Sequence, residues 1–208
     1  NGSGNSLCRD LNLLNPLAAA RAIANNQRIN IDIAKIITNN TVIYNFNIIG
    51  WGMVSSIGIK AEKHRWLGPS RYTIISLIEI FLKKTFKSKI TFYNENELRN
   101  EICDSFIFGV ICNTIHTGKG MKMAPKAKID DGLVDLLLIK NVSRLRLLKL
   151  MPKLFSGAHI NDKNVSYFKI RKLKLSTKSN YKLNIDGEIK GSSSFEFEVL
   201  PKKIQTFK

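Results

Sequence analysis

Two periodicities of apolar residues divide the chain near residue 25. Before that point apolar positions recur at helical spacing, and Asn15-Pro16 is typical of an N-cap followed by a first-turn proline. From residue 27 apolar residues alternate with polar ones, over 29–33 and again over 42–48. A Thr38-Asn39-Asn40 turn separates these two runs, so the pattern predicts a β-hairpin.

Helices and strands also follow from the pattern beyond the hairpin. Residues 72–86 are expected to form a helix with Ile75, Ile78, Phe81 and Leu82 on one face. Ser143 is expected to cap a second helix that ends at Gly157. Residues 94–104 are polar and are predicted to form a loop, and 127–139 a hairpin that turns at Asp131-Gly132. Further strands are predicted at 89–93, 106–115, 167–175, 181–185, 195–199 and 204–207.

Strands outnumber helices after residue 26 and follow one another directly in the sequence. This order favours a mainly β fold, an antiparallel β-sandwich with inserted helices that covers residues 26–208. The alanine-rich helical segment 1–25 does not belong to such a sandwich and is typical of the end of an α/β unit. We therefore predict two domains, 1–25 and 26–208.

The net charge of +17 narrows the classes of partner. A basic excess of this size fits nucleic acid, an anionic membrane surface or a polyanionic small ligand such as ATP. A general bias toward Asn, Ile and Lys explains the excess equally well. No run of five basic residues occurs, which argues against a dedicated nucleic-acid arm and leaves attraction to a membrane surface open.

The cysteines and histidines carry no metal-binding pattern. The three cysteines lack CxxC spacing, and the three histidines lie far apart without neighbouring ligands. We expect no metal site and a reducing compartment. The chain starts without a targeting pattern, and its apolar runs are too short to span a bilayer. These features predict a soluble, cytoplasmic protein with peripheral contact to a membrane as an option.

Three stretches contain residues suited to phosphate chemistry. Gly2, Ser3 and Gly4 precede a predicted helix, where glycines and free backbone N–H groups suit an anion, although such turns are more often structural. Arg65 and Arg71 flank a Gly68-Pro69 turn that can bring both guanidinium groups to one anion; the alternative is a solvated basic loop.

The third stretch is Asp186-Gly187-Glu188 after a predicted strand. Asp-Gly is most often simply a hairpin turn. Two carboxylates that flank a glycine also suit a magnesium ion or a ribose hydroxyl. The sequence alone leaves both interpretations open.

Taken together and in order, these stretches resemble the diacylglycerol kinase catalytic superfamily of lipid kinases. The resemblance is carried by GSGN, by EKHRWLGPSRY at 62–72, by APKAKIDDGLVDLLLI at 124–139 and by DGE at 186–188. It is greatest to sphingosine (long-chain base) kinases, with ceramide kinases similar. It implies an α/β nucleotide-binding domain followed by a lipid-binding β-sandwich, with ATP in the cleft between them and Mg²⁺ as cofactor.

The resemblance also implies roles for individual residues. Gly2, Ser3 and Gly4 would line the nucleotide phosphates, and Arg65 and Arg71 would neutralise them. The triplet 186–188, that is Asp186, Gly187 and Glu188, would contact the nucleotide between the domains. The aspartate that acts as general base in this family is expected upstream of residue 1, so we expect this piece to be inactive alone. The reaction implied is transfer of the ATP γ-phosphoryl group to the primary hydroxyl of a lipid.

One departure from the family pattern concerns the lipid headgroup. The resemblance implies a sphingoid base as substrate, but Ser56 and Gly58 stand where sphingosine kinases carry the acids that recognise its amine. A cationic headgroup would lose a charge-assisted bond of about 1.5–3 kcal/mol. Ceramide or diacylglycerol is therefore the alternative substrate. A basic module that binds anionic membranes or RNA, and an NAD kinase, remain as further alternatives.

Overall fold

The computed structural model describes residues 5–118 and 120–208. Its α-helices are α1 (Ser6–Asp10), α2 (Pro16–Ala24), α3 (Met53–Lys63), α4 (Arg71–Leu82) and α5 (Arg144–Ser156), with 3-10 helices at Arg65–Ser70 and Ala158–Asn161. Its strands are β1 (Arg28–Thr38), β2 (Thr41–Asn45), β3 (Ile48–Gly52), β4 (Phe86–Asn94), β5 (Arg99–Cys112), β6 (Val134–Lys140), β7 (Val165–Ser176), β8 (Lys182–Ile185), β9 (Glu188–Ser192) and β10 (Phe195–Phe207).

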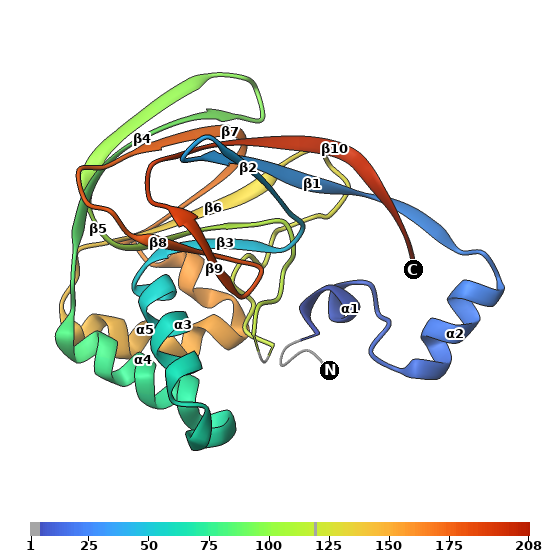
Figure 1. Ribbon diagram of the computed structural model, residues 1–208, viewed down its shortest axis with the longest axis horizontal. Helices are drawn as coiled ribbons and strands as arrows, with labels where there is room; N and C mark the ends of the chain where they lie inside the picture. The colour runs from blue at the N-terminus through green and yellow to red at the C-terminus, as the bar shows by residue number, and fades with distance from the viewer. Residues whose placement is uncertain (1–4, 119) are drawn as a thin grey trace.

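These strands form one antiparallel sheet that folds into two layers, which confirms the mainly β sandwich (Figure 1). The long strands β5 and β7 belong to both layers. Residues 99–106 of β5 pair with β4, whereas residues 108–112 pair with β3 and β6. Likewise 165–170 of β7 pair with β6, and 172–175 pair with β10 and β4. The outer layer thus contains β4, β10, β1 and β2, and the inner layer contains β6, β3, β8 and β9.

The inner layer is buried on both faces. On β6 the side chains of Val134, Leu136 and Leu138 join the core between the layers, and Leu137 and Ile139 join a second core against the helices. Helices α3, α4 and α5 cover this second face (Figure 1). The molecule therefore has three layers, and the helical layer provides the space in which the candidate site forms.

Several local predictions are confirmed. The hairpin of β1 and β2 turns at Asn39 and Asn40, both at positive φ, as tight hairpin turns require. The Asn15 side chain accepts a hydrogen bond from the Leu17 backbone N–H at 2.8 Å at the start of α2. Ser143 caps α5 in the same way, and Gly157 ends that helix at φ 82°.

The predicted loop at 94–104 is wrong, because most of it belongs to β5. The strand begins at Arg99 and pairs with β4 through eight consecutive positions. Arg99 and Glu101 lie on its solvent side, where Glu101 forms ion pairs with Lys89 at 2.8 Å and Arg99 at 3.1 Å. Since one face of the outer layer is solvated, a strand there needs few apolar residues.

The hairpin predicted at 127–139 is also wrong, since only β6 forms. Asp32 explains why no strand forms before β6. It also explains why the strands predicted at 195–199 and 204–207 form the single strand β10. It lies in a bulge of β1, and its buried carboxylate accepts the Gly132 N–H at 2.6 Å and the Lys202 N–H at 2.7 Å. The turn before β6 thus bonds to Asp32 instead of a partner strand, while β10 continues past the bulge.

Asp135, in the inner layer, makes the stability of the fold depend on pH. It lies on the helix-facing side of β6 at 1% exposure, and burial raises the pKa of its carboxyl to about 6, against the opposing effects of Tyr167 and Lys169. The folded state therefore keeps a proton that the unfolded chain releases near pH 4. This contribution to stability is complete below about pH 4 and is lost as the pH rises through about 6.

We predict that Asp135→Asn gains stability relative to the wild type between pH 4 and pH 7. Two pKa units correspond to about 3 kcal/mol, because the asparagine cannot ionise. Urea unfolding at pH 4, 5, 6 and 7 measures the difference. Asp130→Asn, at an exposed position of the preceding turn, is the control and should follow the wild-type profile. Parallel profiles of the wild type and Asp135→Asn would contradict the prediction.

Candidate functional site

Helix α3 is the element on which the candidate site is built. It starts directly after β3, and Gly52 makes the turn at φ 70° in a space where a Cβ would lie 2.6 Å from the Ile107 carbonyl oxygen. Ser55 then fastens α3 to the inner layer, since its hydroxyl donates to the Lys182 carbonyl oxygen at 2.6 Å. The helix therefore lies across β8 and β9 in a fixed position.

Gly58 brings α3 into close contact with Asn184 of β8, just before the turn between β8 and β9. A Cβ at residue 58 would lie 2.6 Å from Nδ2 of Asn184, so any larger residue would force this amide to move. The Oδ1 atom of Asn184 accepts the Gly187 N–H at 3.0 Å. One side chain thus links the helix to the Asp186-Gly187-Glu188 turn.

That Arg65 and Arg71 bind a shared phosphate stays a prediction, but in the structure both contact one anion within the chain. That anion is Glu62 of α3, which accepts from Nε of Arg65 at 2.8 Å and lies 3.5 Å from Nη2 of Arg71. The hydrogen bond and charge of Arg65, with the charge of Arg71, lower the pKa of Glu62. Glu62 lies one turn beyond Gly58 on the same face, a rise of about 6 Å.

An apolar cavity of about 210 Å³ lies beside these residues, between α3, α4, α5 and the inner layer. The described residues that line it include no Asp, Glu, Lys or Arg. Its walls are mainly apolar side chains, among them Ile57, Ile80, Phe108, Met123, Leu150 and Leu154. Such a space suits a hydrocarbon chain.

The wall also contains the polar residues Tyr72, Ser76, Thr117, His159 and Asn184. We call the part formed by Asn184 and Tyr72, which contact Gly58 and Glu62 of α3, the polar end. The Tyr72 hydroxyl lies 3.5 Å from Oε1 of Glu62, and the Arg71 guanidinium carbon lies 4.9 Å from the centre of the Tyr72 ring. Both residues therefore contact groups outside the cavity: Tyr72 contacts Glu62 and Arg71, and Asn184 contacts Gly187. A molecule in the cavity would present its end to this polar region.

The Asp186 carboxylate stabilises the local fold of the site. The oxygens accept the backbone N–H groups of Phe46, Asn47 and Ile48 at 3.0–3.1 Å and the amide of Asn45 at 2.5 Å. Burial raises the pKa of Asp186, although these backbone hydrogen bonds act against the rise. The residue thus joins the turn between β8 and β9 to the turn between β2 and β3.

Gly187 and Glu188 are the accessible part of this turn. A Cβ at Gly187 would meet no atom within 4 Å, and Glu188 is exposed and forms an ion pair with Lys190. Asp186 and Gly187 both have positive φ, so the triplet does form a hairpin turn. Within residues 5–118 and 120–208, no group of three or more His, Cys, Asp or Glu side chains is arranged to hold a metal ion.

Helix α1 is attached next to the cavity. The Asp10 carboxylate accepts the Ile115 N–H at 2.6 Å and also binds the ring of His116. Thr117 and Met121, in the loop that follows, line the cavity. The helix that begins immediately after the predicted phosphate loop is therefore fixed beside the site, while Gly2, Ser3 and Gly4 themselves lie outside the described residues.

The resemblance assigns two positions, 56 and 58, to the lipid headgroup, and only one of them lies at the cavity. Gly58 lines the cavity, whereas Ser56 is not among the lining residues. Sequence reasoning assigned no role to Glu62, Tyr72 or Asn184, although they lie in or next to the stretches it singled out. The spacing of Glu62 and Arg65 at i and i+3 on a helix was a usable signal for the first. The other two depend on contacts between distant segments.

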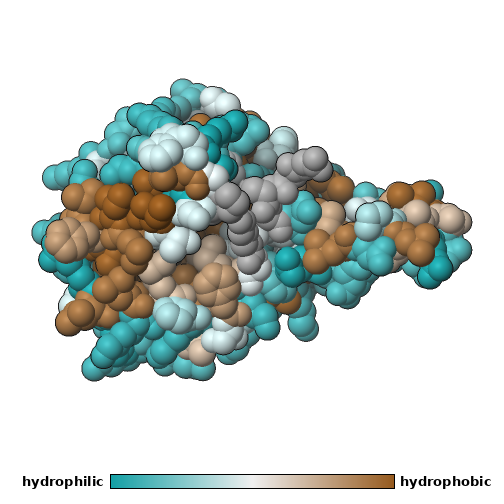
Figure 2. Space-filling model, turned by 90° about the horizontal axis from the view of Figure 1, so that it is seen from below, coloured by the Kyte–Doolittle hydropathy of each residue, from teal (hydrophilic) through white to brown (hydrophobic). Residues whose placement is uncertain are grey.

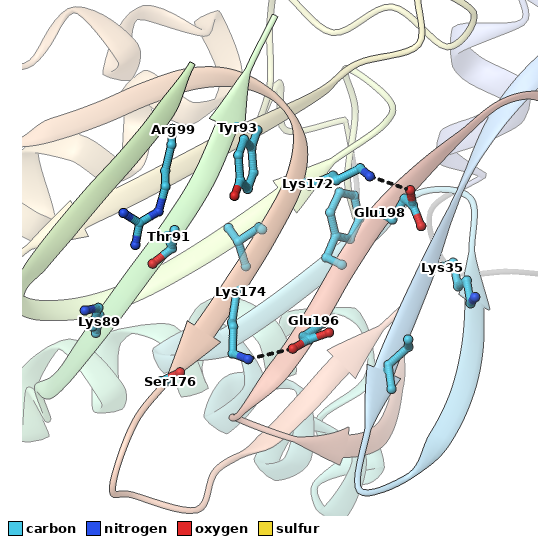
Figure 3. A pocket seen from close by; sticks show the side chains of 13 residues that line it. Lys35, Lys89, Thr91, Tyr93, Arg99, Lys172, Lys174, Ser176, Glu196 and Glu198 are labelled. Atoms are coloured by element: carbon cyan, nitrogen blue, oxygen red, sulfur yellow. Dashed lines mark hydrogen bonds and ion pairs between the residues drawn. The ribbon is translucent and has the colours of Figure 1, made fainter. Parts of the chain in front are cut away.

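A larger depression of about 570 Å³ lies on the solvent side of the outer layer (Figure 3). Charged side chains line it and pair with one another across strands: Lys174 with Glu196 at 2.7 Å and Lys172 with Glu198 at 3.0 Å. Figure 3 shows these pairs lying along β7 and β10. This surface has no connection to the predicted site residues and offers no apolar enclosure.

Comparison with known families gives a consistent result. The family model described as YegS C-terminal NAD kinase beta sandwich-like domain matches residues 47–208. A probable lipid kinase YegS-like of Shewanella frigidimarina is 30% identical over 80% of this chain and 52% of its own length. Sphingosine kinase 1 of Arabidopsis thaliana is 26% identical over 82% and 43%. The chain therefore spans about half the length of the curated relatives it matches.

Further relatives bear names from the same group. A diacylglycerol kinase of Mycobacterium tuberculosis is 30% identical over 79% of this chain and 53% of that protein. Among solved structures, a putative diacylglycerol kinase from Bacillus anthracis superposes with a TM-score of 0.74 at 22% identity, over 99% of this chain and 66% of that one. At this identity the superposition supports the fold alone.

We predict that Gly58→Ala loosens the turn between β8 and β9. The new methyl group would displace the Asn184 amide and break its hydrogen bond with the Gly187 N–H. Such a bond contributes about 1 kcal/mol, so amide hydrogens of the turn should exchange roughly fivefold faster. Because alanine also favours the helix, the informative measurement is hydrogen exchange of residues 182–192 and not overall stability. Ser56→Ala is the matched control on the same helix, and equal exchange in the two variants would refute the link.

Proposed function

The chain belongs to the family of YegS C-terminal NAD kinase beta sandwich-like domains, and from this premise we propose that it forms the lipid-binding part of an ATP-dependent lipid kinase. The relatives named lipid kinase, sphingosine kinase and diacylglycerol kinase support this proposal. The observation that carries it is the uncharged apolar cavity whose polar end adjoins a pair of arginines. The division into residues 1–25, from a nucleotide-binding domain, and 26–208 is part of the proposal.

The arginine pair suits the phosphates of ATP. Guanidinium groups bind phosphate oxygens in a bidentate manner and keep their charge at any physiological pH. Arg65 and Arg71 both contact Glu62, so two cations lie beside one carboxylate, and a phosphate group would reorganise these ion pairs as it binds. Gly2, Ser3 and Gly4 would supply further phosphate contacts, as the resemblance implies.

The turn at 186–188 would contact the nucleotide through Gly187 and Glu188. The open space beside Gly187 lets a ligand approach the backbone, and Glu188 reaches solvent. We assign Asp186 the task of positioning this turn, because its oxygens already accept four hydrogen bonds. Within the described residues no group of three or more His, Cys, Asp or Glu side chains is arranged to hold a metal ion, and no step of the reaction is assigned to a metal held by this chain.

The reaction would proceed at the polar end of the cavity. The lipid lies with a chain in the cavity and its primary hydroxyl beside the arginine pair, and the hydroxyl oxygen attacks the γ-phosphorus as ADP leaves. The arginines stabilise the charge on the transferred group. The aspartate that accepts the hydroxyl proton is expected in the part of the relatives that this chain does not match, so the 208 residues alone should be inactive.

For the substrate we propose a neutral lipid alcohol such as diacylglycerol. A protonated sphingoid amine needs a counter-charge when it leaves water, and no carboxylate is found among the described lining residues. Gly58, one of the two positions where sphingosine kinases carry an acid, is occupied by the close contact with Asn184. An NAD kinase is a weaker alternative, because a dinucleotide would find no charged partner in this cavity.

The test is phosphorylation of diacylglycerol, ceramide and sphingosine by the full-length protein with labelled ATP. We expect diacylglycerol to be the preferred substrate and Arg71→Ala to lower kcat/KM by about 10- to 100-fold, the value of a lost charge-assisted bond. Arg71→Lys should retain part of the activity. Arg99→Ala, on the outer layer, is the control and should match the wild type.

Two results would contradict the proposal. One is the absence of phosphorylation of every lipid tested. The other is equal activity of the wild type and Arg71→Ala when circular dichroism shows both to be folded. Preference for sphingosine would overturn the substrate assignment alone.

A further inference from the structure

All four methionines of the chain line the apolar cavity. They are Met53, Met121, Met123 and Met151, and each belongs to the cavity wall. They come from three separate segments: the start of α3, the loop between β5 and β6, and α5. Only Met121 and Met123 are close in the sequence, so it is the fold that gathers the four side chains around one space.

Methionine differs in flexibility from the other apolar residues of this wall. Its side chain is unbranched, with three rotatable bonds and a polarisable sulfur atom, so it fills spaces of irregular shape. Isoleucine and valine are branched at Cβ and strongly restricted at χ1. Surfaces that bind many different apolar partners are rich in methionine for this reason. A wall with four methionines can therefore follow the shape of the molecule it holds.

Stiff and flexible residues occupy different parts of the wall. The inner layer, α3 and α4 contribute its β-branched apolar side chains, which are Ile48, Val54, Ile57, Ile80 and Ile139. The loop between β5 and β6 and helix α5 contribute Met121, Met123, Met151 and three leucines, and among the described lining residues neither segment contributes an isoleucine or a valine. The loop and α5 therefore form the flexible part of the wall.

The backbone of this flexible part is held in place. The Lys122 N–H donates to the Leu154 carbonyl oxygen of α5 at 2.8 Å. Nε2 of the buried His159, just beyond α5, donates to the Met123 carbonyl oxygen at 3.0 Å. The loop and α5 are thus fixed to each other, so a change in the shape of this part comes from its side chains.

The cavity is small for a lipid chain. At about 210 Å³ it is below the roughly 300–1,000 Å³ typical of sites that enclose a whole ligand. A long acyl chain needs further space, and methionine side chains can provide it by changing between staggered rotamers. A short chain needs the same side chains to fill the space that it leaves empty.

The helical layer that covers the cavity is exposed on its outer side. Of the face predicted for α4 from the sequence, only Ile75 is buried, whereas Ile78, Phe81 and Leu82 are exposed. Figure 2 shows this layer from outside, with apolar residues gathered over the region of α4 and α5. None of the helices in the described part of the chain is long and apolar enough to cross a membrane. Because their outer side is exposed, α4 and α5 have room to shift as the cavity fills.

We propose that the four methionines make the cavity adaptable, so that the kinase accepts diacylglycerols with acyl chains of different length and unsaturation at similar efficiency. This inference rests on the proposed function and names the range of substrates of the same site. A rigid hydrophobic pocket distinguishes substrates that differ by one methylene by about 10- to 200-fold. An adaptable wall lacks this discrimination, because it closes around a short chain and opens for a long or bent one.

The test compares kcat/KM of the full-length protein for dioctanoyl, dipalmitoyl and dioleoyl glycerol in detergent micelles at equal mole fraction. For the wild type we expect the three values to lie within about tenfold of one another. Replacement of all four methionines by leucine conserves the volume of the wall and removes its flexibility. The values of this variant should differ by about 100-fold or more between the best and the worst lipid.

The matched control is Leu136→Met with Leu138→Met, which makes exchanges of the same size in the core between the two sheet layers and should keep the wild-type profile. Met121→Leu with Met151→Leu, at two half-buried positions, covers the case in which the fourfold variant does not fold and should shift the profile in the same direction. A wild-type profile that varies about 100-fold or more would overturn the inference. So would an unchanged profile in both methionine variants, or an equal change in the control.

Competition with a photoactivatable diacylglycerol separates this inference from the kinase function. The three lipids should suppress labelling of the full-length protein at concentrations within about tenfold of one another, whether or not phosphate is transferred. This pattern without phosphorylation would contradict the proposed function and support the adaptable cavity. Phosphorylation with a steep preference for one chain would support the proposed function and overturn the adaptable cavity.

Discussion

The close contact between α3 and the turn of β8 and β9 determines the arrangement of the whole site. Gly58 has no side chain, so the Asn184 amide can lie against the helix and hold Gly187. Ser55 fixes the same helix to β8. One turn further along α3, Glu62 holds Arg65 and Arg71. The apolar cavity, the arginine pair and the accessible turn at 187–188 are therefore neighbours because a single helix contacts all three.

Electrostatics explain why the arginine pair can remain assembled without a ligand. Two guanidinium groups at one place repel each other, and the Glu62 carboxylate compensates their charge. The pKa of Glu62 is lowered, chiefly by the hydrogen bond from Arg65, because the neighbouring cations stabilise the ionised carboxylate. A phosphate would add negative charge beside Glu62, so nucleotide binding is expected to reorganise these ion pairs rather than simply join them.

Local sequence patterns predicted the parts of the structure that depend on local forces. The Asn39-Asn40 hairpin, the Ser143 cap and the Gly157 helix end all follow from short-range chemistry, and the alternating strands indicated the sandwich. The start of β5 was missed because a strand on a solvated face carries little apolar signal. The region before β6 was misjudged because its hydrogen bonds go to Asp32, about 100 residues earlier.

The same division applies to the candidate site. The spacing of Arg65 and Arg71 indicated a shared ligand anion, which stays a prediction, and their contact with Glu62 of the same chain was not predicted. The cavity was not predictable, since its wall combines residues from three helices and the inner layer. The central claim is that this cavity holds the lipid chain. Photocrosslinking of the full-length protein with a diacylglycerol that carries a diazirine at the end of one acyl chain tests it most directly. The account predicts labelling of the segments that contain Met123 and Met151, whereas labelling confined to the outer layer would contradict it.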